Sequence, residues 1–113
     1  MRKLKLVVVM LAFVSQLAWG MTVSPTHTGS WYNPPQSGHG LSVEVLDSDT
    51  TIIYWYVYDP EGNPIFLVTA ATNSGSNASG TTYYYSGMRF GEFDPNDNVQ
   101  EVWGTASLTF HSC

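Results

Sequence analysis

The fold is decided by residues 51–68, which read TIIYWYVYDPEGNPIFLV. Two runs rich in β-branched and aromatic residues flank a short polar segment, a pattern typical of two strands joined by a turn. Asp59, Pro60 and Gly62 stand at the positions that these residue types favour in a type I turn closed by a glycine bulge. The turn predicts an antiparallel hairpin in which Asp59 pairs with Asn63.

The predicted turn also fixes which side chains face one another across the hairpin. The expected pairs are Trp55 with Leu67 and Val57 with Ile65 on one face, and Tyr56 with Phe66 and Tyr54 with Val68 on the other. Pairs of aromatic and β-branched residues contribute about 0.2–1 kcal/mol each to a sheet. Because residues 51–58 are apolar on both faces, we expect this strand to be central.

The rest of the chain indicates the same class of structure. Residues 41–45, 81–85 and 99–110 read as strands and residues 88–90 as a short one, while residues 72–80 and 93–98 have the composition of solvated loops. In residues 99–110 we expect Val102, Ala106 and Leu108 on one face and Trp103 on the other. The sequence predicts an all-β domain, an antiparallel meander that forms a small curved sheet or an incomplete barrel or sandwich.

The first twenty residues have the features of a secretory signal peptide. Basic residues at positions 2, 3 and 5 precede an apolar run over residues 6–14 and a small-residue ending at Gly20. The run is shorter than the ~20 residues that cross a bilayer, although a retained N-terminal anchor is the alternative. We expect a signal peptide at 1–20, a flexible lead-in at 21–30 and a single β domain at 31–113, in a secreted or periplasmic protein without a membrane span.

The charges that remain after the leader exclude some partners. Arg89 is then the only basic residue against nine acidic ones, so the clusters of Lys and Arg that bind nucleic acids or anionic lipids are missing. The chain has a single cysteine, Cys113, which rules out an internal disulfide. We interpret Cys113 as a terminal thiol, with an intermolecular disulfide as the alternative.

Three motifs follow one another along residues 29–110. They are WYNP at 31–34 with SGHG at 37–40, WYVYDPEGNP at 55–64 and GTASLTF at 104–110. This set resembles a β-rich unit of secreted proteobacterial proteins, which implies an exported β domain and no particular activity. The family usually carries Trp where Ile65 and Phe66 stand, and its unit continues into another strand, whereas this chain ends at Cys113. If that closing strand is missing, the sheet has an exposed edge or a neighbour supplies the strand.

Aromatic residues are the strongest candidates for a binding surface. The candidate contacts are Trp31, Tyr32, Tyr54, Tyr56 and Tyr58. Stiff aromatic rings offer large amphipathic contact areas to a carbohydrate or a peptide. The alternative interpretation is that these rings fill the core of a small β domain. The preferred hypothesis is a secreted, non-catalytic binding module of unknown ligand; the alternative is a structural β unit that assembles edge to edge with another copy or a larger partner.

Other chemistry finds less support in the sequence. Asp94, Asn96 and Asn98 resemble the start of a calcium loop, but the positions that need Gly and Glu hold Val99 and Thr105, and an Asx-rich turn explains the segment equally well. The three histidines, His27, His39 and His111, lack metal-ligand spacing. We assign no catalytic residue and no cofactor, and a hydrolase is the least supported hypothesis.

Overall fold

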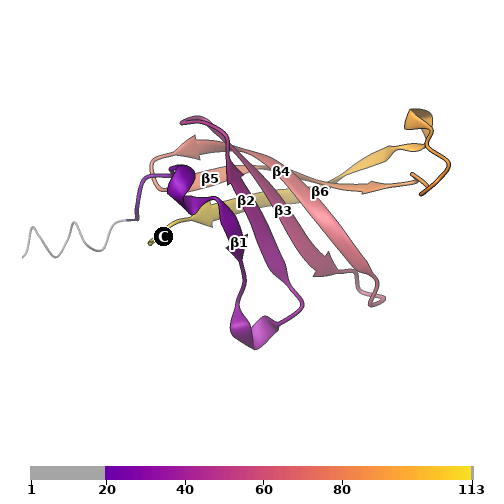
Figure 1. The fold of residues 1–113 in the computed structure, drawn as a ribbon, viewed down its shortest axis with the longest axis horizontal. Helices are drawn as coiled ribbons and strands as arrows, with labels where there is room; N and C mark the ends of the chain where they lie inside the picture. The colour runs from indigo at the N-terminus through magenta and orange to yellow at the C-terminus, as the bar shows by residue number, and fades with distance from the viewer. Residues whose placement is uncertain (1–19, 113) are drawn as a thin grey trace, which may run out of the picture.

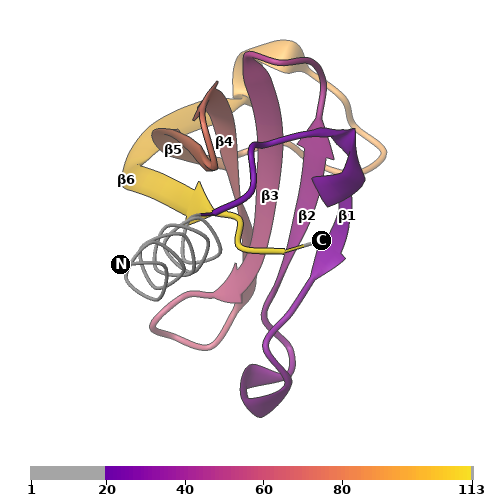
Figure 2. The ribbon, with the colours of Figure 1, turned by 90° about the vertical axis from the view of Figure 1, so that its left-hand side faces the viewer.

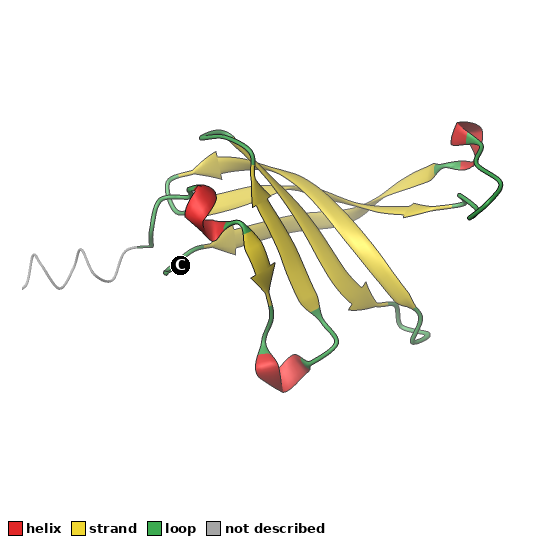
Figure 3. Cartoon of the chain, in the orientation of Figure 1, coloured by secondary structure: helices red, strands yellow, loops and turns green. Residues whose placement is uncertain are grey.

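The computed structural model describes residues 20–112, which form one antiparallel sheet of six strands (Figure 1). The strands lie in the sheet in chain order, so each one pairs only with its sequence neighbours. Their bounds are β1 Gly29–Trp31, β2 Gly40–Val45, β3 Thr50–Tyr58, β4 Pro64–Ser74, β5 Asn77–Ser86 and β6 Val99–Thr109. Single 3₁₀ turns lie in the connections at η1 Pro25–His27, η2 Pro34–Gln36 and η3 Pro95–Asp97 (Figure 3). The predicted all-β antiparallel meander is confirmed.

The hairpin of β3 and β4 has the predicted register. Trp55 pairs with Leu67 and Tyr56 with Phe66, and β3 is central because β2 pairs with its other edge. At the turn, the amide of Asp59 donates to the carbonyl of Asn63 at 2.9 Å. Gly62 has a φ of 89°, a conformation that a side chain would strain, and this confirms the glycine bulge.

The sheet curves so strongly that β6 comes round toward β1, and the strands form an open arc (Figure 2). Its inner face carries the core, in which Val43, Ile53, Leu67 and Ala78 are buried. Buried threonines complete the inner face, and the hydroxyls of Thr69 and Thr82 lie 2.6 Å apart in a hydrogen bond. Small and β-branched residues fit here because side chains converge on the inside of a tightly curved sheet.

One end of the arc is closed by the segment that leads into β1. The His27 ring stacks on Phe110 at a centroid distance of 4.3 Å, and the amide of Met21 donates to the carbonyl of Phe110 at 2.7 Å. Val23 and His27 are both buried. Within residues 21–30, which the sequence predicts to be a flexible lead-in, Val23 and His27 therefore pack into the core, while most other side chains of the segment are exposed.

The predicted loop over residues 72–80 is wrong. Strand β4 continues to Ser74 and β5 starts at Asn77, so a tight turn joins them. The polar residues of this segment make hydrogen bonds within the fold, since the Thr51 hydroxyl donates to Asn73 Oδ1 at 2.7 Å and Asn73 Nδ2 donates to the Asp47 carbonyl at 3.2 Å. The polar composition predicted a solvated loop, whereas these side chains form hydrogen bonds that connect neighbouring segments at this end of the sheet.

The connection between β5 and β6 projects beyond the sheet as an arm (residues 87–98; Figure 1). The predicted strand at 88–90 is reduced to a single bridge between Arg89 and Glu92. Phe90 and Phe93 are both exposed on the arm. These residues therefore add little to the core.

Two predictions fall on residues outside the described range of 20–112. They are the signal peptide, which covers residues 1–20 and of which only Gly20 is described, and the terminal thiol of Cys113. Among the described residues, no helix is long and apolar enough to cross a membrane.

The inner face predicts the response of the fold to truncation of neighbouring side chains. Leu67→Ala removes a fully buried side chain, and we expect it to lower the free energy of unfolding by about 2–5 kcal/mol. Phe66→Ala is the matched control on the exposed face and should cost less than about 1 kcal/mol. Urea unfolding of both variants measures this, and equal losses would contradict the assignment of the faces.

Candidate ligand-binding groove

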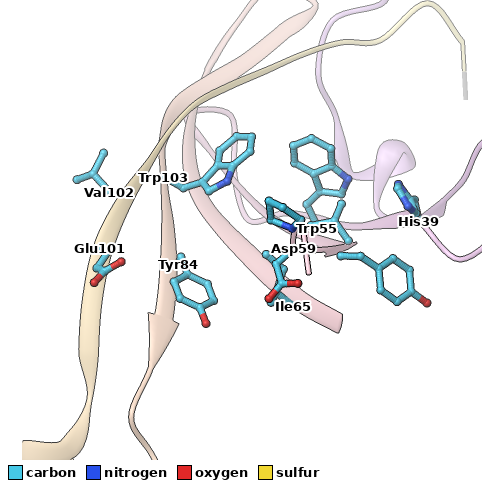
Figure 4. A pocket seen from close by; sticks show the side chains of 11 residues that line it. His39, Trp55, Asp59, Ile65, Tyr84, Glu101, Val102 and Trp103 are labelled. Atoms are coloured by element: carbon cyan, nitrogen blue, oxygen red, sulfur yellow. The ribbon is translucent and has the colours of Figure 1, made fainter. Parts of the chain in front are cut away.

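The inner face of the sheet is hollowed next to the buried core. Two adjoining hollows of about 720 and 580 Å³ share His39, Trp55 and Trp103 as lining residues. Figure 4 shows the side chains that line the first of them. We call this concave surface the tryptophan groove. Binding sites for small molecules are typically concave, about 300–1,000 Å³ in volume, and lined by apolar side chains with a few polar groups. The tryptophan groove has these properties.

Trp55 forms the floor of the groove because of the hairpin register. It follows Ile53 on the inner face of β3 and lies between Leu41 of β2 and Leu67 of β4. Ile53 and Leu67 are buried, whereas Trp55 is only half-buried. The buried core therefore ends at Trp55, and its indole ring is open to the groove.

Trp103 forms the opposite wall because of a bulge in β6. Thr82 pairs with Gly104 but Tyr83 pairs with Val102, so Trp103 is an extra residue in the ladder. Its ring lies 5.5 Å from that of Trp55 at an interplanar angle of 83°, and the residue is 52% exposed. The predicted alternation of this strand, which placed Trp103 on the face away from Ala106 and Leu108, is therefore wrong at the bulge.

Polar groups lie along the rim of the first hollow. Figure 4 shows Glu101 and Tyr84 on one side of the two tryptophans and His39 on the other, with Asp59 also lining the hollow. Glu101 pairs with Tyr84 across β5 and β6 and is exposed. Among the described residues, the one ion pair joins Arg89 to Glu92 on the arm, so the carboxylates of the groove have no ion pair with a Lys or Arg side chain.

Asp59 is held in place by its own turn. Its Oδ1 accepts hydrogen bonds from the amides of Asn63 at 2.8 Å and Glu61 at 3.0 Å. The backbone hydrogen bond from Asn63 is the main reason that the pKa of Asp59 lies below its ordinary value of 3.8. Asp59 thus presents a fixed negative charge at the rim.

The second hollow is lined by both edges of the sheet. Trp31 and Tyr32 contribute from the β1 side, and Ser107 and Leu108 from β6. Trp31 is fixed by its Nε1, which donates to the carbonyl of His27 at 2.9 Å. Tyr32 is exposed. These two candidates from the sequence therefore border the groove.

The remaining candidates lie elsewhere. Tyr54, Tyr56 and Tyr58 are 36%, 50% and 49% exposed on the outer face of β3, and with Phe66 they form what we call the tyrosine face. The alternative interpretation, in which these rings fill the core, is wrong, because they lie on the outer face of the sheet and are exposed. Tyr58 is at the end of the strand and also reaches the groove, where its ring lies 5.6 Å from that of His39.

The candidate calcium ligands lie together on the arm. Asp94 Oδ1 accepts a hydrogen bond from the amide of Asn96 at 2.9 Å, which caps η3. Asn98 ends the same turn. Within residues 20–112, no three His, Cys, Asp or Glu side chains are grouped so that they could hold a metal ion. The Asx turn, which was the alternative interpretation, is present here, and the calcium site stays a prediction.

The sequence analysis missed two tryptophans of the groove, Trp55 and Trp103, as candidate contacts. The position of Trp103 depends on the bulge in β6. Gly104 was the available signal, since glycine inside a strand often marks a bulge. Comparison with protein-family models, with curated proteins and with solved structures finds no match to this chain. The groove is therefore interpreted from its own residues.

The hydrogen bonds of Asp59 predict a pH dependence of stability. Because folding lowers its pKa, the carboxylate stabilises the fold above pH 3.8 and loses this effect as the pH falls through the lower folded-state pKa. We expect Asp59→Asn to be less stable than the wild type at neutral pH, by a margin that shrinks below pH 3.8. Urea unfolding at a series of pH values measures the margin, and a constant margin would contradict this role.

Proposed function

We propose that the chain is an exported, non-catalytic binding module whose ligand occupies the tryptophan groove. One observation carries the proposal: Trp55 and Trp103 expose indole surface to the same concave hollow. Leaving such rings open to water forgoes the free energy of burying them. A ligand that covers them would recover it, and sugars and peptides both stack well on aromatic rings.

The architecture supports the groove over the tyrosine face as the site. The groove is lined by strands from both edges of the sheet and by the η2 connection, which supplies Gln36. The tyrosine face has only a smaller hollow of about 340 Å³, between Tyr56 and Phe66. A concave surface covers more of a ligand than an outer sheet face does.

The chemistry of Asp59 suits it to charge recognition rather than to general acid catalysis. A general acid must hold its proton near the working pH. Asp59 has a lowered pKa and its carboxylate accepts hydrogen bonds from its turn, so it is ionised at neutral pH and suited to hold a fixed charge. Export is proposed from the basic and apolar leader at residues 1–20 and from the resemblance to secreted proteobacterial units, and it implies a secreted or periplasmic protein.

Glycan and peptide arrays probed with the purified protein test the proposal. We expect a ligand whose affinity falls about two- to tenfold in Trp103→Leu, because a stacked aromatic pair is worth about 0.5–1.5 kcal/mol. Tyr56→Leu is the control on the tyrosine face and should bind normally. Loss of binding in Tyr56→Leu alone would move the site to that face, and the absence of any ligand on both arrays would overturn the proposal.

A second candidate function rests on the free edge of β6. Among the described strands β6 pairs only with β5 over its eleven residues, while the other edge strand, β1, has three. A long unpaired edge is a template for another strand. The alternative is therefore a structural unit that assembles edge to edge with another copy or a larger partner.

The oligomeric state tests this alternative. If copies pair along β6, the mass measured by sedimentation should rise with concentration. Thr105→Lys should keep the protein monomeric, because a lysine on an edge strand opposes pairing. Glu44→Lys, on the exposed face of β2 and away from the β6 edge, is the control variant. A mass independent of concentration would exclude self-assembly.

A further inference from the structure

We infer that the tryptophan groove selects ligands that carry an organic ammonium group. This inference rests on the proposed function and names the chemical class of the ligand. It begins from the geometry of Trp55 and Trp103, whose ring planes are nearly perpendicular at a centroid distance of 5.5 Å. Two such rings form adjacent walls of a corner in which a cation can contact more than one aromatic side chain.

The indole ring is the aromatic surface that attracts cations most strongly. A cation is held when it lies within about 6 Å of the ring centroid, over the face of the ring. In an edge-to-face pair the contact uses one face of one ring, so other faces stay available to a ligand. Tyr84, on the same inner face of the sheet, supplies a third ring to the lining.

The charges around the hollow favour the same class of ligand. Asp59 and Glu101 both line it, and neither has a Lys or Arg partner among the described residues. The described part of the chain has nine acidic residues and one basic residue, Arg89, which is paired with Glu92 on the arm. The field of the protein therefore attracts cations toward the groove and repels anions.

The size of the hollow leaves room for the rest of the ligand. A volume of about 720 Å³ exceeds what a trimethylammonium group needs, and the second hollow of about 580 Å³ continues toward Trp31. The ammonium group can belong to a free small molecule or to a lysine side chain of a peptide. Both sources share the chemistry that the aromatic corner and its carboxylates recognise.

The decisive experiment compares ligands of equal shape and different charge. We titrate the purified protein with choline and with its neutral isostere 3,3-dimethylbutan-1-ol, and follow binding by calorimetry and tryptophan fluorescence. Choline should bind about tenfold more tightly, because a desolvated cation–aromatic contact is worth up to about 2 kcal/mol. In a second arm, the peptide acetyl-Gly-Lys-Gly-amide is compared with its norleucine analogue, which has the same caps and no ammonium group, and the arm that binds identifies the source of the ammonium group.

Variants then locate the site. Trp103→Leu should abolish the preference for the cation, whereas Trp103→Phe, which keeps a ring, should retain part of it. Glu101→Gln should weaken binding of the cation by about two- to fivefold, and Glu44→Gln, which removes an exposed carboxylate outside the groove, should leave it unchanged. Circular dichroism of each variant checks that it is folded.

Two results would overturn the inference. Equal affinities within both pairs of ligands would show that charge is not recognised, as would the failure of both cationic probes to bind. If a neutral glycan or peptide from the arrays binds and depends on Trp103, the proposed function stands while the inference fails. If no ligand of any class binds, both fail.

Discussion

The register of the β3–β4 hairpin is the constraint on which the rest of the structure depends. The hydrogen bonds that Asp59 accepts within its turn, together with the bulge at Gly62, fix which residues of the two strands face one another. A slip of one residue would exchange the two faces of a strand. It would take either Leu67 out of the core or Trp55 out of the groove, depending on which strand shifts.

The hairpin was predictable because its signals are local. Turn residues and alternating side chains lie within eighteen residues of one another, and they specify pairing whatever the rest of the chain does. Alternation does not say which face is covered, however. The sheet buries the part of its inner face that carries threonines and small aliphatic residues, and it exposes the tyrosines of its outer face. The large rings of Trp55 and Trp103 also belong to the inner face, where they line the groove.

The features that sequence reasoning missed depend on distant parts of the chain. Trp103 faces Trp55 only because β6 holds an extra residue opposite β5. His27 is buried because Phe110, at the end of the last strand, comes back to stack on it. Neither of these two contacts can be predicted from the residues that adjoin Trp103 or His27 in the sequence. The proposed binding surface therefore differs from the predicted one: it is a hollow lined from both edges of the sheet, and Tyr54 and Tyr56 lie outside it.

The chain-order arrangement of the strands has a consequence for how the molecule assembles. Each strand can add to the one made just before it, so every step closes a short loop and costs little chain entropy. The contact between Met21 and Phe110 is different, because it needs nearly the whole domain to be in place. We expect this contact between Met21 and Phe110 to form last and to open first, well before the hairpins separate.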